Sequence, residues 1–209
     1  MEPSLPDPQI IWLDSADSTN SALRRLSEGL DNLSIVAARA QTAGRGQDDH
    51  TWFASPGTNL TFSILYRFGG ESALAAADAI LITQVTTLAL RDYLLSHGVQ
   101  ARIKWPNDIW VGDRKICGIL IENRLEGAAV QESIVGIGLN LNETDWPEEL
   151  PNPVSLRELT GRTYDLETEL EGLHKEICRR FGQLASGDGR RSLQEEFGKY
   201  MFRLPEGPK

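Results

Sequence analysis

Four apolar, strand-like stretches follow one another between Ala101 and Leu141 with only short polar turns between them, and this pattern constrains the fold most strongly. They cover residues 101–105, 108–111, 115–123 and 130–141, and earlier strands are expected over 10–13, 34–40 and 60–68. Gly112-Asp113 is typical of a hairpin turn. Because strands joined by such turns pair antiparallel, the pattern predicts a mostly antiparallel sheet.

Helical stretches fill most of the remaining sequence. Asp17 to Asn20 offers capping side chains ahead of the short stretch SALRRLSEGL, and the Ala-rich residues 72–97 predict a central buried helix ending before Gly98. Two amphipathic helices are expected over 166–185 and 192–201, separated by a flexible SGDGR segment. The predicted fold class is α+β, a mixed, mostly antiparallel β-sheet backed by helices. A single domain is the expectation for 209 residues.

Composition and charge exclude several classes of protein. Forty per cent hydrophobic residues indicate a packed core, and 21 Lys and Arg against 30 Asp and Glu give a net charge of −9, which argues against DNA binding through phosphates. Cys117 and Cys178 are the only cysteines, so neither a disulfide framework nor a zinc cluster is expected. Cys117 is interpreted as a small apolar packing residue, and Cys178 as structural or incidental. No stretch has the pattern of a signal peptide or a membrane span. A cytoplasmic location is the expectation.

Two motifs offer cations to a ligand. Gly44-Arg45-Gly46 follows a strand and allows close backbone approach around a permanent positive charge, which suits a carboxylate or a phosphate. Lys104 ends an apolar strand ahead of Pro106, at a sheet end where ligands often bind. Each has an equally good structural alternative when taken alone: a surface turn with an incidental Arg, and a strand end with a solvated Lys.

Glycines inside predicted strands mark a bulge or a place where a ligand contacts the backbone. Gly118, Gly136 and Gly138 are of this kind, and their two strands are expected to flank one pocket. The three histidines lack metal-ligand spacing, and no GxSxG motif is present. Four tryptophans offer aromatic faces to a fused ring, although core packing is the more common role of each: Trp52, Trp105, Trp110 and Trp146.

Six segments, taken in order, resemble the biotin protein ligases. They are DSTN (17–20), QTAGRG (41–46), Trp52, PGTNLTFS (56–63), KWPNDIWVGDRKICGILIE (104–122) and GIGLNLN (136–142). The resemblance covers roughly residues 11–160 and implies a class II synthetase-like catalytic domain of the biotin/lipoate ligase superfamily. It further implies an enzyme, a biotin–[acetyl-CoA-carboxylase] ligase. Such enzymes join biotin to ATP as biotinoyl-5′-adenylate and transfer the acyl group to one lysine of a biotin carboxyl carrier protein.

The resemblance also implies residue roles. Lys104 and Arg45 would be catalytic, holding the biotin carboxylate against the α-phosphate of ATP. The implied biotin-binding residues are Ser18, Thr19, Asn20, Gln41, Gly44, Arg45, Lys104, Gly118 and Gly136. The implied ATP- and adenylate-binding residues are Gly46, Trp52, Asn107, Asp108, Gly138 and Asn140. ATP and Mg²⁺ are the implied cofactors, but no residue is assigned as a metal ligand because Mg²⁺ mainly binds ATP oxygens and water.

The glycine-containing loop departs from the family pattern. Where relatives usually carry basic residues and a glycine, this chain has Gln47, Asp48, Asp49 and His50. Two carboxylates near a triphosphate would weaken ATP binding or adenylate retention by about 1 kcal/mol per contact, unless they point outward or associate with Mg²⁺. We therefore expect looser ordering of the loop on its ligand. An unchanged adenylate off-rate in the double variant Asp48→Arg, Asp49→Gly would count against this.

The ends of the chain suggest a single catalytic domain. No helix-turn-helix is expected ahead of Ile10, so repressor activity is not expected, and the chain stops at LPEGPK, where many relatives begin a small β-barrel that we expect to be absent or truncated. A monomer and a side-by-side homodimer both remain open. Two alternative functions also remain open: a lipoate or octanoate ligase or transferase, and a non-catalytic biotin or adenylate sensor.

Overall fold

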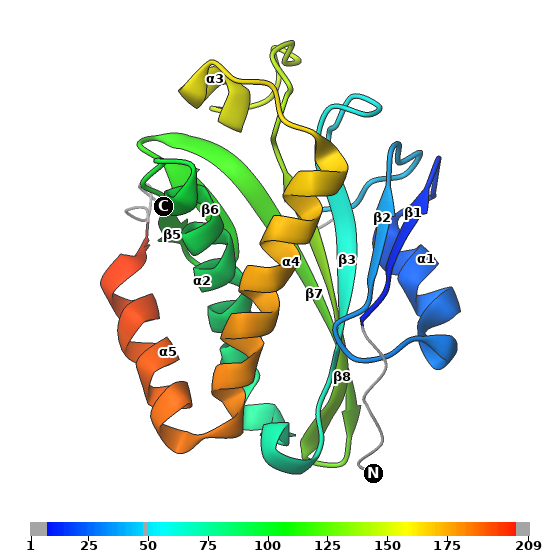
Figure 1. Ribbon diagram of the computed structural model, residues 1–209, viewed down its shortest axis with the longest axis vertical. Helices are drawn as coiled ribbons and strands as arrows, with labels where there is room; N and C mark the ends of the chain where they lie inside the picture. Colours follow the sequence, from blue (N-terminus) through cyan, green and yellow to red (C-terminus); the bar gives the residue numbers. More distant parts are fainter. Residues whose placement is uncertain (1–7, 48–49, 204–209) are drawn as a thin grey trace, which may run out of the picture.

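A mixed sheet organises the molecule in the computed structural model, which describes residues 8–47 and 50–203. Within them the nine strands run in the order β1-β2-β3-β8-β7-β6-β5-β9, and β4 pairs with β8 (Figure 1). The strands are β1 (Ile10–Leu13), β2 (Ile35–Ala38), β3 (Leu60–Arg67), β4 (Leu74–Ala75), β5 (Arg102–Lys104), β6 (Asp108–Val111), β7 (Arg114–Glu126), β8 (Ala129–Leu139) and β9 (Met201–Phe202). The pairs β1–β2 and β5–β9 are parallel and the others antiparallel, which confirms the predicted fold class.

The two faces of the sheet have different chemistry because side chains alternate along each strand. On β3, Phe62 and Ile64 belong to the larger hydrophobic core, whereas Leu65 belongs to a smaller one. On β7 and β8, Ile119 and Ile137 lie in the larger core. Their neighbours Gly118 and Gly138 face the opposite side, so one face carries the larger core and the other carries glycines, polar groups and the smaller core.

Three helices cover the apolar face: α2 (Ile80–Ser96), α4 (Leu166–Gly182) and α5 (Gly187–Tyr200) (Figure 1). α2 is buried along most of its length, in keeping with a helix that is apolar on nearly every side. α1 (Thr19–Leu26) packs on the other face, where Ala22 and Leu23 meet the smaller core. None of the helices in the described ranges is long and apolar enough to cross a membrane.

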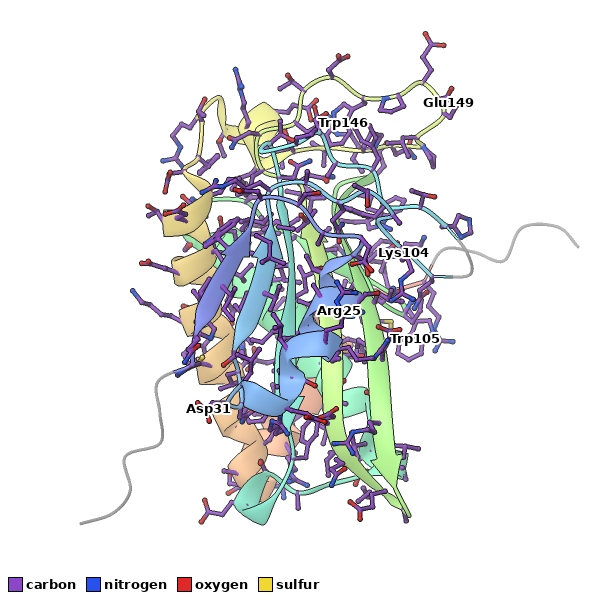
Figure 2. All side chains as sticks on the ribbon, turned by 90° about the vertical axis from the view of Figure 1, so that its right-hand side faces the viewer. Arg25, Asp31, Lys104, Trp105, Trp146 and Glu149 are labelled. Atoms are coloured by element: carbon purple, nitrogen blue, oxygen red, sulfur yellow. The ribbon has the colours of Figure 1, made fainter. Side chains whose placement is uncertain are left out.

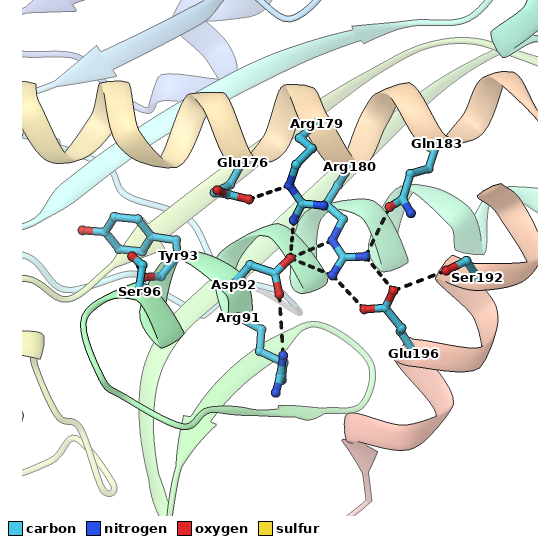
Figure 3. Close-up of polar contacts among 10 residues, drawn as sticks. All are labelled: Arg91, Asp92, Tyr93, Ser96, Glu176, Arg179, Arg180, Gln183, Ser192 and Glu196. Carbon is cyan, nitrogen blue, oxygen red and sulfur yellow. Dashed lines mark hydrogen bonds and ion pairs between the residues drawn. The ribbon is translucent and has the colours of Figure 1, made fainter.

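A cluster of ion pairs joins the three covering helices (Figure 3). Arg180 on α4 is 5% exposed and lies between Asp92 of α2, at 2.7 Å from Nε to Oδ2, and Glu196 of α5, at 2.7 Å from Nη2 to Oε2. Arg179 adds a second contact to Asp92, at 2.6 Å from Nη2 to Oδ2. Since a buried guanidinium is costly unless it is paired, this cluster fixes how α2, α4 and α5 pack against one another.

The predicted helix from residue 72 begins later than expected, at Ile80. Residues 70–72 and 76–78 form short 3₁₀ turns, and Leu74–Ala75 form β4, whose residues pair with Val130 and Ala129 of β8. The Ala-rich composition favours a helix, but the available strand edge determines the structure here.

The predicted flexible SGDGR segment is the first turn of α5. Ser186 is the N-cap, and its Oγ accepts a hydrogen bond from the Gly189 backbone N–H at 3.0 Å. A capping side chain therefore outweighs the low helix propensity of two glycines. A further short helix, α3 (Leu156–Thr160), was not predicted as a separate element, although Ser155 and Glu158 form a capping box at its start.

Candidate active site

A cavity of about 670 Å³ opens on the glycine-bearing face of the sheet. Its walls come from the start of α1, from two segments of the loop before β3, from the β5–β6 turn and from β7, β8 and residues 146–153. In Figure 2, Lys104 and Trp105 lie at the side of the sheet and Trp146 lies on the loop above them. This volume is in the range of cavities that bury a small organic ligand.

The floor of the cavity is made of glycines on adjacent strands. Gly118 and Gly138 are register partners, and Gly136 pairs with Leu120. The indole of Trp52 lies directly over this floor: a Cβ would lie 2.2 Å from the ring at Gly138 and 2.8 Å from it at Gly118. Any larger residue at these positions would displace the ring, so these glycines accommodate the Trp52 side chain, and the expected contact with a ligand stays a prediction.

Three cations and a single carboxylate are found among the described residues that line the cavity, and two of the cations, both lysines, contact the carboxylate. Arg45, Lys104 and Lys115 all line it, and Asp108 lies 3.7 Å from Lys104 Nζ and 2.8 Å from Lys115 Nζ. A positive site on a chain of net charge −9 is a local arrangement rather than an effect of overall composition. Arg45 and Lys104 come from distant segments and share one cavity, as the sequence analysis expected.

Lys115 is a cavity residue that the sequence analysis did not identify. Strict alternation along β7 would place Lys115 and Gly118 on opposite faces, but the β6–β7 register shifts between Ile109 and Trp110, where a bulge is inserted. Both therefore line the same cavity. The signal was an Arg-Lys pair whose lysine stands three residues before a strand glycine, and its meaning depended on a bulge that the sequence does not reveal.

The start of α1 is joined to the loop before β3 at one end of the cavity. Ser18 caps α1, its Oγ accepting from the Ser21 backbone N–H at 3.2 Å. The Thr19 backbone N–H donates to Gln41 Oε1 at 2.8 Å. Because Oε1 is engaged, the Gln41 amide presents its Nε2 as the remaining donor. This end therefore offers several neutral hydrogen-bonding groups close together.

Several buried polar atoms that belong to cavity-lining residues find no hydrogen-bond partner within residues 8–47 and 50–203: Trp52 Nε1, Trp110 Nε1 and Asn140 Oδ1. Asn140 is 3% exposed and its Nδ2 donates to the Val154 carbonyl at 3.1 Å. Since buried polar groups are nearly always paired, these atoms point to a ligand with polar groups of its own.

All the predicted site residues except Gly44 line this cavity. Gly44 lines a neighbouring hollow instead, and a Cβ there would lie 2.8 Å from the Trp52 carbonyl oxygen, so its glycine accommodates the loop itself. Asn107 lines the cavity, but its Nδ2 donates to the Ile119 carbonyl and so also ties the β5–β6 turn to β7. The prediction about Asp48 and Asp49 lies outside the described residues.

The described residues offer few side chains that could bind a metal ion. The described ranges contain no group of three or more His, Cys, Asp or Glu side chains arranged to hold a metal ion. Asp108 is a carboxylate that lines the cavity. A Mg²⁺ ion that brings phosphate oxygens and water as its other ligands needs only one or two protein carboxylates, so the residues present fit a nucleotide-bound ion.

The chain is similar in sequence to a known protein family. Residues 12–140 match the biotin/lipoate A/B protein ligase family. The chain belongs to this family. Within it, the chain is 39% identical to a biotin–[acetyl-CoA-carboxylase] ligase of Paracoccus denitrificans over 180 residues, which cover 82% of this chain and 72% of that protein.

Other family members extend the comparison. A bifunctional ligase/repressor of Bacillus spizizenii is 31% identical over 164 residues, and the chain spans about half of its length, 48%. A solved structure of a biotin protein ligase from Aquifex aeolicus, in complex with biotin and ATP, superposes with a TM-score of 0.78 at 25% identity, covering 95% of this chain and 84% of that one. The fold of this ligase-family chain is therefore that of a biotin protein ligase catalytic domain.

Proposed function

We propose that the chain is a biotin protein ligase that acts in the cytoplasm. It would activate biotin with ATP to biotinoyl-5′-adenylate and transfer biotin to a lysine of a biotin carboxyl carrier protein domain. One observation carries this proposal: Arg45, Lys104 and Lys115 surround a glycine-floored cavity on a strongly acidic chain. Two anions, a carboxylate and a nucleotide phosphate, must approach each other in the first step, and such a site offsets their repulsion.

The neutral end of the cavity suits the fused ring of biotin. Ser18, Thr19 and Gln41 present hydroxyl and amide groups there, which can pair with the ureido donors and acceptors. A buried ligand that left those groups unpaired would bind poorly. The chain's relatives act on biotin by name, and this donor and acceptor set suits a ureido ring better than the dithiolane of lipoate.

The cations that line the cavity suit the nucleotide. Arg45 and Lys104 would hold the biotin carboxylate against the α-phosphate, and Lys115, which contacts Asp108, adds a third charge. The unpaired Asn140 Oδ1 is an acceptor for an amino group such as that of adenine. Mg²⁺ would arrive with ATP and lower the charge on its phosphates, with Asp108 as its protein ligand.

Incubation with biotin, Mg·ATP and a carrier domain tests this proposal. The expected result is pyrophosphate release that depends on biotin, followed by biotin attached to the carrier. Isothermal titration with biotin and with lipoate separates the substrate classes. Tight lipoate binding without biotin binding would overturn the choice of substrate, and biotin binding without pyrophosphate release would indicate a sensor.

A further inference from the structure

Glu122 lies at the end of the glycine-floored cavity, on the same face of β7. Alternate residues of a strand share a face, so Gly118, Leu120 and Glu122 follow one another along β7. The first two line the cavity. Glu122 comes next in the row, and its side chain is 26% exposed.

Three donors from two distant parts of the chain converge on this carboxylate. Asn20 Nδ2 donates to Glu122 Oε2 at 2.7 Å, and Arg24 Nη2 lies 3.1 Å from the same oxygen. Asn20 and Arg24 are four residues apart on α1 and so share a helix face. Arg45 Nη2 lies 3.4 Å from each Glu122 oxygen. Glu122 thus connects α1 with the glycine-containing loop.

The carboxylate is the nearer of two acceptors that orient the Asn20 amide, the other being the Leu120 carbonyl at 3.5 Å from Nδ2. Because a carboxylate only accepts hydrogen bonds, the Asn20 Nδ2 must point to it. The other end of the amide, Oδ1, then accepts from Ser63 Oγ at 2.5 Å. That oxygen lies over Gly136, where a Cβ would be only 2.3 Å away. Asn20 is 3% exposed and lines the cavity, so its orientation is part of the site.

Glu122 remains ionised under ordinary conditions. Burial opposes its ionisation, but the hydrogen bond from Asn20 and the charges of Arg24 and Arg45 outweigh that effect and hold the pKa of this carboxyl below its usual range. A permanent negative charge therefore lies beside Arg45, outside the set of residues that line the cavity.

We propose that Glu122 is a positioning residue: it orients Asn20 at the biotin end of the cavity and holds Arg45 at the cavity wall for the adenylation step. This proposal rests on the ligase activity proposed above. It adds that the two contacts of Glu122 have separate roles: the contact with Asn20 supports biotin binding, and the contact with Arg45 supports the chemical step.

Glu132 provides a matched control. It is another paired carboxylate of the same sheet, on β8, with Arg124 Nε at 2.9 Å and Arg67 Nη1 at 3.5 Å. It does not line the cavity, and its partners do not either. Any general effect of removing a charged pair from the sheet should therefore appear in Glu132→Gln as well.

The test compares Glu122→Gln, Glu122→Ala and Glu122→Asp with Glu132→Gln. In Glu122→Gln the amide oxygen still accepts from Asn20 but the charge beside Arg45 is lost, so pyrophosphate release under saturating biotin should fall about tenfold with biotin affinity nearly unchanged. Glu122→Ala loses both contacts and should also weaken biotin binding about tenfold in isothermal titration. Glu122→Asp, which keeps the charge, should recover part of the rate lost in Glu122→Gln.

The outcomes separate the two proposals. If the wild-type chain releases no pyrophosphate, the ligase activity fails, and the biotin affinity of Glu122→Ala still tests the role at Asn20. If the wild type is active and Glu122→Gln behaves like Glu132→Gln, the positioning role is overturned. Equal losses of rate and biotin affinity in Glu122→Gln would overturn the separate roles of the two contacts. Thermal unfolding of each variant identifies any that fails to fold, and Glu122→Gln, which preserves shape, then carries the test.

Discussion

Replacing Lys104 with methionine removes one cation from the cavity and keeps an unbranched apolar side chain of similar length. Lys104 Nζ lies 3.7 Å from Asp108, and its side chain is 26% exposed. At an effective dielectric constant of about 20, one ion pair at about 4 Å gains about 4 kcal/mol. Part of this is offset because Lys104 must share its charge with Asp108. We therefore expect a loss of about 2–3 kcal/mol in the adenylation step, which corresponds to about 100-fold in rate.

Single-turnover pyrophosphate release measures that rate, and isothermal titration measures biotin affinity separately. Biotin affinity should fall much less than the rate, because Arg45 and the neutral groups around Thr19 and Gln41 still hold biotin. Lys175→Met, at an exposed position of α4, is the control for loss of a lysine. Comparable losses of rate and affinity would show that Lys104 anchors biotin rather than assisting the chemistry, and an unchanged rate would refute the electrostatic argument.

Three further predictions concern the rest of the structure. Asp92→Asn should lower the free energy of unfolding in urea by about 2 kcal/mol. The loss is smaller than for a buried guanidinium left without any partner, because Arg180 still pairs with Glu196. A change below about 0.5 kcal/mol would contradict this. Gly138→Ala should force Trp52 off the cavity floor and lower the free energy of unfolding by about 1–3 kcal/mol. Unchanged tryptophan emission together with unchanged stability would contradict this. A hydrogen bond from Arg180 holds the pKa of Glu196 below its ordinary value. The Arg180–Glu196 pair therefore stabilises the fold above the unfolded pKa of about 4.5, and this stabilisation is lost as the pH falls through the lower pKa of the folded state. Glu196→Gln should flatten the decline in urea stability from about pH 6 to about pH 3, and an identical decline would refute it.

The sequence predicted the sheet well because its strands are separated by recognisable turns. Gly112 in the β6–β7 turn has a φ of +60°, a conformation that glycine adopts readily, and the predicted hairpin is present there. The errors came where tertiary pairing decided between two local options. Leu74 and Ala75 lie in a helix-favouring stretch but pair with β8, and the glycines after Ser186 lie in a helix because a serine caps it.

The candidate site was predictable where its residues stand in short, recognisable motifs, and not where tertiary contacts bring them to the cavity. Arg45 and Lys104 stand in short motifs whose glycine or proline neighbours are visible in the sequence. Lys115 lies on the cavity side because of a β-bulge, and Glu122 matters because α1 and the glycine-containing loop meet there. Neither the bulge nor a contact between segments 77 or 102 residues apart follows from spacing along the chain.

In the proposed first step, this cavity brings the biotin carboxylate into bonding contact with the α-phosphate of ATP. Biotin labelled with ¹⁸O in both carboxyl oxygens tests it directly, in a reaction with Mg·ATP and a carrier domain followed by mass spectrometry of the AMP released. A carboxylate oxygen that attacks phosphorus stays with the phosphate when the carrier lysine takes the acyl group. The expected product is AMP that carries one ¹⁸O atom, and unlabelled AMP alongside biotinylated carrier would contradict this step.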